Sequence, residues 1–284
     1  MKIVITGAEG KLGRALMKKM PSHHQVTPLN TKLCDVRDTR VVSDLITEFS
    51  PDVVIHCAAY TAVDQAETEK TLCWDINVNG SINVAKACEA IKAKMILIST
   101  DYVFDGEGTE PYGVFHPTRP LNEYGKSKAE AEIAVSRIVS NYFIVRTSWM
   151  FGDGGNFVRT IRRIAQDNHR ATVVTDQIGS PTYSEDLADL LIDMAETEAY
   201  GTYHVTNEGF CSWADLAEET MNQLNIDADI LRVTSPNFPM SAKRPLNSRL
   251  SKDCLDNNGF YRLPSWQDAL QRYLKDHEGA LKLV

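Results

Sequence analysis

The chain of 284 residues lacks any long uninterrupted apolar segment. Its apolar runs are much shorter than the roughly 18 residues that a membrane-spanning helix needs, so we expect no transmembrane helix. The apolar part of the N-terminal stretch is too short for a signal peptide, and Gly7 follows it at once. We therefore expect a cytoplasmic protein with no membrane partner.

An excess of positive charge is also missing. The 30 lysines and arginines are outnumbered by 38 aspartates and glutamates, which gives a formal net charge of −8. Nucleic-acid-binding domains present a positive surface, so the composition argues against a nucleic-acid partner. The balance still allows one anionic ligand held by local cations.

Cysteines are few and scattered. The 6 cysteines include no C-x-x-C pair, and disulfide frameworks belong mainly to short secreted chains. We expect reduced thiols throughout. No cysteine–histidine spacing typical of structural zinc is present, and the 7 histidines show no metal spacing. We predict no metal site, and we predict that His23 and His24 form a surface turn.

What the sequence does contain is a regular alternation of segment types in its first half. Short apolar segments predict strands and periodic segments predict helices between them. The strands are expected at 2–6, 26–29, 53–55, 95–98 and 142–146, and the helices at 11–20, 41–49, 76–91 and 125–138. Continuous apolar strands of this kind are typical of a parallel sheet covered on both faces.

We predict an α/β fold with a Rossmann-like, doubly wound parallel sheet and a smaller, partly interleaved C-terminal substrate domain. The second half is less regular, but 202–205 predicts a late strand that returns to the sheet. The predicted dinucleotide-binding domain comprises residues 1–147 and 182–206. The predicted substrate-binding domain comprises residues 148–181 and 207–284.

A glycine motif separates the first predicted strand from the first helix. Gly7, Gly10 and Gly13 have the spacing G-x-x-G-x-x-G. Glycine permits positive φ and close approach of the backbone to a ligand, and a helix N-terminus offers free N–H groups to a pyrophosphate. The context indicates a dinucleotide site. A plain tight turn between strand and helix is the alternative.

The residue that meets the adenosine ribose in such folds lies about 20 positions further on. Here it is Asn30, which lacks the negative charge that repels a 2′-phosphate, and Lys32 could attract one. We predict that NADPH is accepted, with NADH as a second option. Asp35 and Val36 are expected near the adenine, although Asp35 could equally cap a helix.

Tyr124 and Lys128 form a Y-x-x-x-K pattern, and positions four apart share one face of a helix. A neighbouring lysine favours the phenolate, so we expect the pKa of Tyr124 to lie below its usual value of about 10. Thr100 follows the strand 95–98, where a hydroxyl could hydrogen-bond a substrate carbonyl or simply form a turn. The glycine motif, the strand-end hydroxyl and Y-x-x-x-K appear in the order that a hydride-transfer enzyme needs.

These motifs resemble the extended short-chain dehydrogenase/reductase superfamily and, more narrowly, the dTDP-4-dehydrorhamnose reductase family. The resemblance covers most of the chain and is carried by six segments. They are Cys57–Asp64, Ser99–Gly106, Pro120–Lys128, Arg146–Trp149, Asp176–Thr182 and Arg244–Leu250. Two runs are specific to the family: Thr-Asp-Tyr-Val-Phe in the second segment and Arg-Pro-x-Asn-Ser in the last.

The resemblance implies reduction of the C4 keto group of dTDP-4-dehydro-L-rhamnose to give dTDP-L-rhamnose. Thr100 would polarise the keto group, Tyr124 would donate the proton, and Lys128 would tune Tyr124 and hold the nicotinamide ribose. The remaining implied contacts are Gly10, Lys11 and Leu12 on the pyrophosphate, Ala59, Tyr60 and Thr61 on the cofactor, and Thr100, Asp101 and Trp149 on the substrate.

Two positions depart from the family pattern. Asn30 stands where an acidic residue is frequent. Ala15 stands where relatives with a metal-bridged dimer have a glutamate, although Glu185 is retained. We therefore expect a monomer or a homodimer without a bridging metal.

A nucleotide diphosphate needs cations and hydrogen-bond donors. The candidate cations are Arg244 and its neighbours Lys243 and Arg249. The candidate donor is the amide of Asn156 at the start of a helix. Alternatively, these cations are solvated surface charges that bind no ligand, and this interpretation applies above all to Lys243. We retain Arg244 and Asn156 as predicted substrate-binding residues.

Two other functions remain open from the sequence. One is 4-ketoreduction of a different nucleotide-linked deoxysugar. The other is a non-catalytic, NADP-binding regulatory subunit like that of methionine adenosyltransferase. The intact set of Thr100, Tyr124 and Lys128 favours an enzyme.

Overall fold

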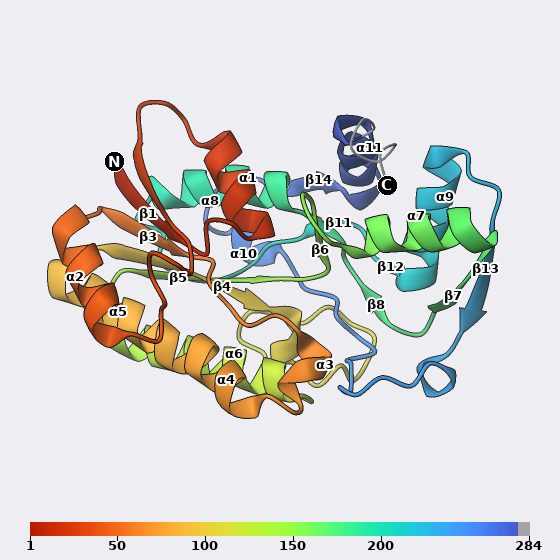
Figure 1. Ribbon diagram of the computed structural model, residues 1–284, viewed down its shortest axis with the longest axis horizontal. Helices are drawn as coiled ribbons and strands as arrows, with labels where there is room; N and C mark the ends of the chain where they lie inside the picture. The colour runs from red at the N-terminus through yellow and green to blue at the C-terminus, as the bar shows by residue number, and fades with distance from the viewer. Residues whose placement is uncertain (278–284) are drawn as a thin grey trace.

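The computed structural model describes residues 1–277 and is built around a six-stranded sheet (Figure 1). The strand order is β10-β5-β4-β3-β1-β2, and every pairing is parallel. The strands are β1 (Lys2–Thr6), β2 (Gln25–Leu29), β3 (Val53–His56), β4 (Lys94–Thr100), β5 (Tyr142–Thr147) and β10 (Gly201–His204). The predicted doubly wound sheet, with its late returning strand, is confirmed.

Helices cover both faces of the sheet. On one face lie α1 (Lys11–Lys19) and α8 (Ser184–Ala195); on the other lie α2 (Thr39–Phe49), α5 (Gly80–Ile91) and α6 (Glu123–Ile138). Alternation along β1 serves both cores, because Ile3 and Ile5 pack toward α1 and α8 whereas Val4 packs toward α2 and α5. The shorter helices α3 (Val63–Ala66) and α4 (Lys70–Trp74) and a π-helical turn (Asp75–Asn79) precede α5.

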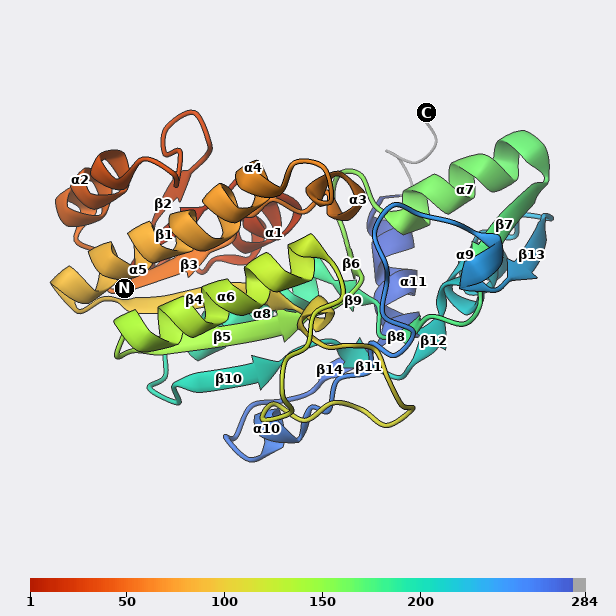
Figure 2. The same cartoon turned by 90° about the horizontal axis from the view of Figure 1, so that it is seen from below.

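The smaller lobe lies at one end of the sheet, toward the right of Figure 2. Its helices are α7 (Phe157–Asn168), α9 (Trp213–Leu224) and α11 (Trp266–Asp276). Its short strands form the pairs β6 (Met150–Phe151) with β9 (Thr182–Tyr183), β7 (Arg170–Val174) with β13 (Asp229–Val233), β8 (Ile178–Gly179) with β12 (Cys211–Ser212), and β11 (Asn207–Glu208) with β14 (Leu263–Ser265). The helix α10 (Asp253–Asp256) packs on β10.

Two observations bear on the sequence predictions. Within residues 1–277, no helix has the length and apolar character that crossing a bilayer requires. All 6 cysteines are free thiols. The predicted substrate-binding domain extends to residue 284, so its last seven positions lie outside the described residues.

A buried ion pair joins α6 to the sheet. Arg146 Nη2 on β5 lies 2.7 Å from Glu132 Oε2, and each side chain is only 7% exposed. Ser99 at the end of β4 donates a hydrogen bond to Glu132 Oε1, and Arg146 also donates to the Val114 carbonyl oxygen. The pair therefore fixes the helix that carries Tyr124 and Lys128 against β4 and β5.

Removing one member of this pair leaves an uncompensated buried charge. We expect Glu132→Gln to lower the free energy of unfolding by about 3–5 kcal/mol, measured by urea denaturation. The double variant Glu132→Met/Arg146→Met removes both charges and should recover most of that loss. A loss below about 1 kcal/mol in the single variant would contradict this account.

Candidate active site

The carboxyl ends of β1 and β3 form the switch point of the sheet, where the strand order reverses and where ligands bind in folds of this type. Gly7 directly follows β1 and has φ +65°, and a Cβ there would lie 2.6 Å from the Ala58 backbone nitrogen. A Cβ on Gly13 would lie 2.5 Å from the Gly7 carbonyl oxygen. The glycines thus let the turn into α1 pass close to the end of β3.

The N-terminus of α1 is available to an anion. Gly10 is its N-cap residue, and within the described residues no side chain caps the helix. Lys11, Leu12 and Gly13 form its first turn and line a cavity of about 420 Å³. The Lys11 ammonium reaches across to the Met150 carbonyl oxygen at 3.0 Å, and burial lowers the pKa of Lys11. Free N–H groups and the positive helix end suit a pyrophosphate at this point.

A second cavity of about 270 Å³ adjoins the first and shares Gly10, Cys57 and Ala59 with it. Asn30, Asp35 and Val36 lie at this second cavity, as does Arg37, whereas Lys32 does not. Arg37 pairs with Asp35 at 2.5 Å, and this contact lowers the pKa of Asp35. Sequence reasoning missed Arg37, although its place two residues after Asp35 puts both on the same turn.

The Asn30 side chain is held in place on both sides. Its Nδ2 donates to Glu9 Oε1 at 2.7 Å, and its Oδ1 accepts from the backbone nitrogens of Lys32 and Leu33. The Asn30 amide therefore presents a fixed polar edge beside the glycine turn. No carboxylate stands at position 30 itself.

Tyr124 and Lys128 both face the larger cavity, together with Thr100. The helix α6 begins at Glu123, because the Asn122 side chain accepts a hydrogen bond from the Gly125 nitrogen, so both residues lie on one helix. Burial raises the pKa of the Tyr124 phenol, against a hydrogen bond with Thr100 that lowers it. The predicted lowering of the pKa of Tyr124 by Lys128 is therefore wrong for the free protein, because desolvation of the phenolate dominates.

Lys128 is 3% exposed. Burial lowers its pKa to about 8, while Glu132, one turn further along α6, acts in the opposite direction. The ammonium therefore stays mainly protonated at neutral pH. The same charge lowers the pKa of the buried His56, whose pKa of about 3 reflects burial above all.

The turn that follows β4 places Asp101 beside Thr100. The Thr100 hydroxyl donates to Asp101 Oδ1 at 3.0 Å, whereas the buried Oδ2 atom has no hydrogen-bond partner in the described part of the chain. Burial raises the pKa of Asp101 to about 6, although hydrogen bonds with Ser248 and Thr100 lower it. Because Thr100 and Asp101 both line the larger cavity, the pair offers a hydroxyl and a carboxyl group to one ligand.

A hydrogen-bond network connects the π-helical turn to α6. Sequence reasoning did not find this network. Asn77, in the π-helical turn, donates to Ser127 Oγ at 2.9 Å and accepts from the Tyr60 backbone nitrogen at 2.8 Å. Ser127 in turn donates to the Tyr124 carbonyl oxygen. Asn77 thus connects the segment after β3 to the helix that carries Tyr124. A π-helical turn is frequent at functional sites, but the sequence gives no periodicity signal for it.

The other predicted contacts divide into two groups. Ala59, Thr61 and Trp149 line the larger cavity, and the Trp149 ring stacks on Trp213 with a centroid distance of 3.9 Å. Tyr60 is held by Asn77 through its backbone, and its hydroxyl donates to Glu69.

Asn156 and Arg244 do not line the larger cavity. The Asn156 amide donates to the Gly152 carbonyl oxygen and to the Tyr273 hydroxyl. Arg244 Nη2 pairs with Asp64 Oδ2 at 2.7 Å. The polar groups of both side chains are hydrogen-bonded or paired within the protein. Their predicted contact with substrate remains a prediction.

Comparison with known proteins gives a consistent result. The family model described as RmlD substrate binding domain matches residues 1–278. The dTDP-4-dehydrorhamnose reductase of Aggregatibacter actinomycetemcomitans is 40% identical over 290 residues, covering 95% of this chain and 97% of that protein. The spore coat polysaccharide biosynthesis protein SpsK of Bacillus subtilis is 38% identical over 281 residues, covering 98% and 99%. A crystal structure of the Bacillus anthracis dTDP-4-dehydrorhamnose reductase in complex with NADP has a TM-score of 0.95 and 41% identity, covering 97% of this chain and 99% of that one.

The raised pKa of Asp101 predicts that the site carries a cost in stability. Below the unfolded pKa of about 4 the carboxyl group is neutral in both states. Between that value and about 6 the native state binds more protons, so the stability of the protein falls as pH rises and then stays lower. We expect Asp101→Asn to be more stable than the parent by about 1–3 kcal/mol at pH 8, with the difference vanishing near pH 3.5. Urea denaturation at several pH values measures this, and a pH-independent difference would contradict the assignment.

Proposed function

Because this chain belongs to the dTDP-4-dehydrorhamnose reductase family, we propose that it reduces the C4 keto group of dTDP-4-dehydro-L-rhamnose with NADPH and releases dTDP-L-rhamnose. The family resemblance drawn from the sequence motifs is confirmed. The observation that carries the proposal is the meeting of Thr100, Tyr124 and Lys128 in one cavity with the glycine turn of α1. Reduction of this ketone is the last step of dTDP-rhamnose synthesis.

The residues of the two adjoining cavities fit a dinucleotide. At Gly7 the backbone comes so close to Ala58 that no Cβ would fit. The uncapped first turn of α1 supplies N–H donors for a pyrophosphate. We assign the adenosine end to the second cavity, with Asn30, Asp35 and Val36. Arg37 at that cavity can pair with a 2′-phosphate, which favours NADPH while leaving NADH as a second option. When bound, the reduced nicotinamide supplies the hydride.

Tyr124 holds the proton that the reaction consumes. Since burial raises the pKa of its phenol, Tyr124 is protonated throughout the neutral range and can donate to the alkoxide oxygen that develops at C4. Thr100 must turn its hydroxyl from Asp101 toward the keto oxygen to polarise it. The Lys128 ammonium holds the nicotinamide ribose and stabilises the phenolate that remains after proton donation.

The substrate end of the cavity is assigned to Thr100, Asp101 and Trp149. The Trp149 ring is fixed by its stacking on Trp213, so it offers a rigid apolar face to the sugar or the nucleotide base. Asn156 and Arg244 remain proposed substrate residues; for Arg244 this requires exchange of its partner Asp64 for the diphosphate.

We propose the two-domain division of the sequence analysis for this chain as well. The strands of the large sheet and α8 fall within residues 1–147 and 182–206, and the remaining elements from β6 onward fall within 148–181 and the segment after 206, apart from β9. The free thiols support a reducing compartment, and we propose a cytoplasmic enzyme that acts as a monomer or a homodimer.

A substrate assay tests the proposed reaction. Loss of absorbance of the reduced cofactor is followed with dTDP-, UDP- and GDP-linked 4-ketosugars, each with NADPH and with NADH. We expect the highest kcat/KM with dTDP-4-dehydro-L-rhamnose and NADPH. A higher value with another nucleotide sugar would assign a different ketoreductase function, and cofactor binding without turnover would assign a regulatory subunit.

Substitution of the proton donor separates chemistry from binding. We expect Tyr124→Phe to lower kcat by about 10²–10⁴-fold while cofactor affinity stays nearly unchanged, because only the hydroxyl is lost. Tyr142→Phe is the matched control, since Tyr142 begins β5 at the opposite end of the sheet. Unchanged turnover in Tyr124→Phe would refute the role assigned to Tyr124.

A further inference from the structure

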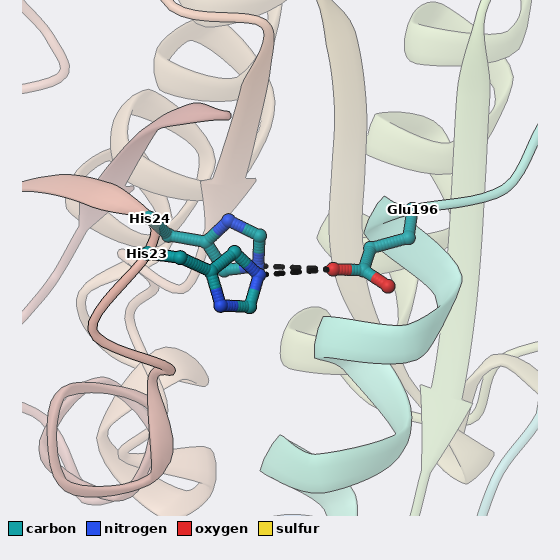
Figure 3. A group of neighbouring side chains, drawn as sticks. All are labelled: His23, His24 and Glu196. Atoms are coloured by element: carbon teal, nitrogen blue, oxygen red, sulfur yellow. Dashed lines mark ion pairs between the residues drawn. The ribbon is translucent and has the colours of Figure 1, made fainter.

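Three side chains with metal-ligating atoms meet at a point remote from the active site (Figure 3). His23 and His24 directly precede β2, and Glu196 is the C-cap residue of α8. Their ligand atoms all lie within 4.8 Å of one another. We propose that His23, His24 and Glu196 bind a divalent transition-metal ion such as Zn²⁺.

The distances between the ligand atoms match such an ion. Glu196 Oε1 lies 3.1 Å from His24 Nε2 and 3.7 Å from His23 Nε2. Nitrogen and oxygen ligands bind Zn²⁺ at about 2.0–2.2 Å, so two ligands of one tetrahedral ion stand roughly 3.3–3.5 Å apart. Figure 3 shows both imidazole rings directed at the same carboxylate oxygen. The two observed oxygen–nitrogen separations lie on either side of this range.

The His24 ring provides an independent observation that points to a ligand. Its side chain is 2% exposed, and Nε2 is buried without a hydrogen-bond partner among residues 1–277. The contact with Glu196 therefore has the distance of a hydrogen bond but not its orientation. A buried polar atom that stays unsatisfied costs free energy, and a metal ion in front of Nε2 would satisfy it.

The charge around Glu196 favours a cation. Glu196 ends α8, where the helix dipole is negative. Asp193 lies in the preceding turn, and its pKa is raised by burial and by the carboxylates of Glu196 and Asp189. Among the described residues, the positive groups nearby are the Met1 amino group, beside His24 Nδ1, Lys19, which pairs with Asp189, and Lys94, which donates to the carbonyl oxygens of Ala195 and Thr197 at 3.2 and 2.7 Å. A bound cation would relieve the repulsion among the carboxylates.

The ligand set also indicates which metals fit and what the ion does. Two imidazoles and one carboxylate suit Zn²⁺ and its transition-metal neighbours, whereas Mg²⁺ and Ca²⁺ prefer oxygen ligands. The site lies before the first residue of β2, at the amino end of the sheet, and the proposed active site lies at the carboxyl end. The ion would therefore connect the α1–β2 turn to the end of α8 as a structural link, and turnover should not depend on it.

Calorimetric titration of the chelator-treated full-length protein with Zn²⁺ tests the proposal. We expect one tightly bound equivalent in the parent protein. Glu196→Gln and His23→Gln each remove one ligand and should weaken that affinity by at least the roughly 10–100-fold that loss of a group supporting a ligand already causes. Both side chains are exposed, at 49% and 67%, so we expect the variants to fold, which unchanged far-UV circular dichroism checks.

The matched control is Glu198→Gln, an exposed carboxylate two residues further along that does not belong to the cluster. It should bind Zn²⁺ like the parent protein and show the same Zn²⁺-dependent rise in Tm, which Glu196→Gln should lose. Co²⁺ should give the visible absorption of a four-coordinate site in the parent and in Glu198→Gln only. Absence of a tight equivalent in the parent, or equal binding by Glu196→Gln and Glu198→Gln, would overturn the proposal.

Discussion

Removal of water from the carboxyl ends of β3, β4 and β5 is the constraint on which the rest of the proposed active site depends. Lys128, Asp101 and Tyr124 all lose hydration there, and in each case burial is the largest influence on the pKa. Burial disfavours the charged form of every group. It therefore raises the pKa of the acids Asp101 and Tyr124 and lowers the pKa of the base Lys128. It keeps Tyr124 protonated, brings the pKa of Asp101 up to about 6 and that of Lys128 down to about 8.

Polar contacts within the fold hold the helix that carries Tyr124 and Lys128 in place, although burial of these groups costs hydration free energy. The pair of Arg146 with Glu132 holds α6 against β4 and β5, and Asn77 holds it from the side of β3. Tyr124 and Lys128 therefore reach the cavity from a helix that is anchored at both faces. The close turn at Gly7 brings α1 to the same edge of the sheet. The positions of Tyr124 and Lys128 are thus fixed by polar contacts within the protein as well as by apolar packing.

Much of this arrangement could be predicted from the sequence. Apolar runs gave the order of the strands along the chain, and the glycine spacing placed the turn before α1, because both signals are local. Contacts between distant segments could not be predicted in the same way. Nothing local shows that Arg244 pairs with Asp64, that Asn77 reaches Ser127, or that Glu196 meets His24. The expected lowering of the pKa of Tyr124 is wrong for a related reason, since the Y-x-x-x-K pattern shows the lysine but not the depth of burial.

The central claim is that Tyr124 is a neutral phenol in the free protein and so is ready to donate its proton. Protein labelled with ¹³C at the tyrosine ring carbon that bears the hydroxyl measures this by NMR, with the Tyr124 signal assigned from its absence in a variant that lacks this tyrosine. The account predicts that the Tyr124 signal keeps the chemical shift of the protonated form up to pH 10 and beyond. A titration of that signal near neutral pH would show that the lysine, and not burial, controls the phenol, and would contradict the account.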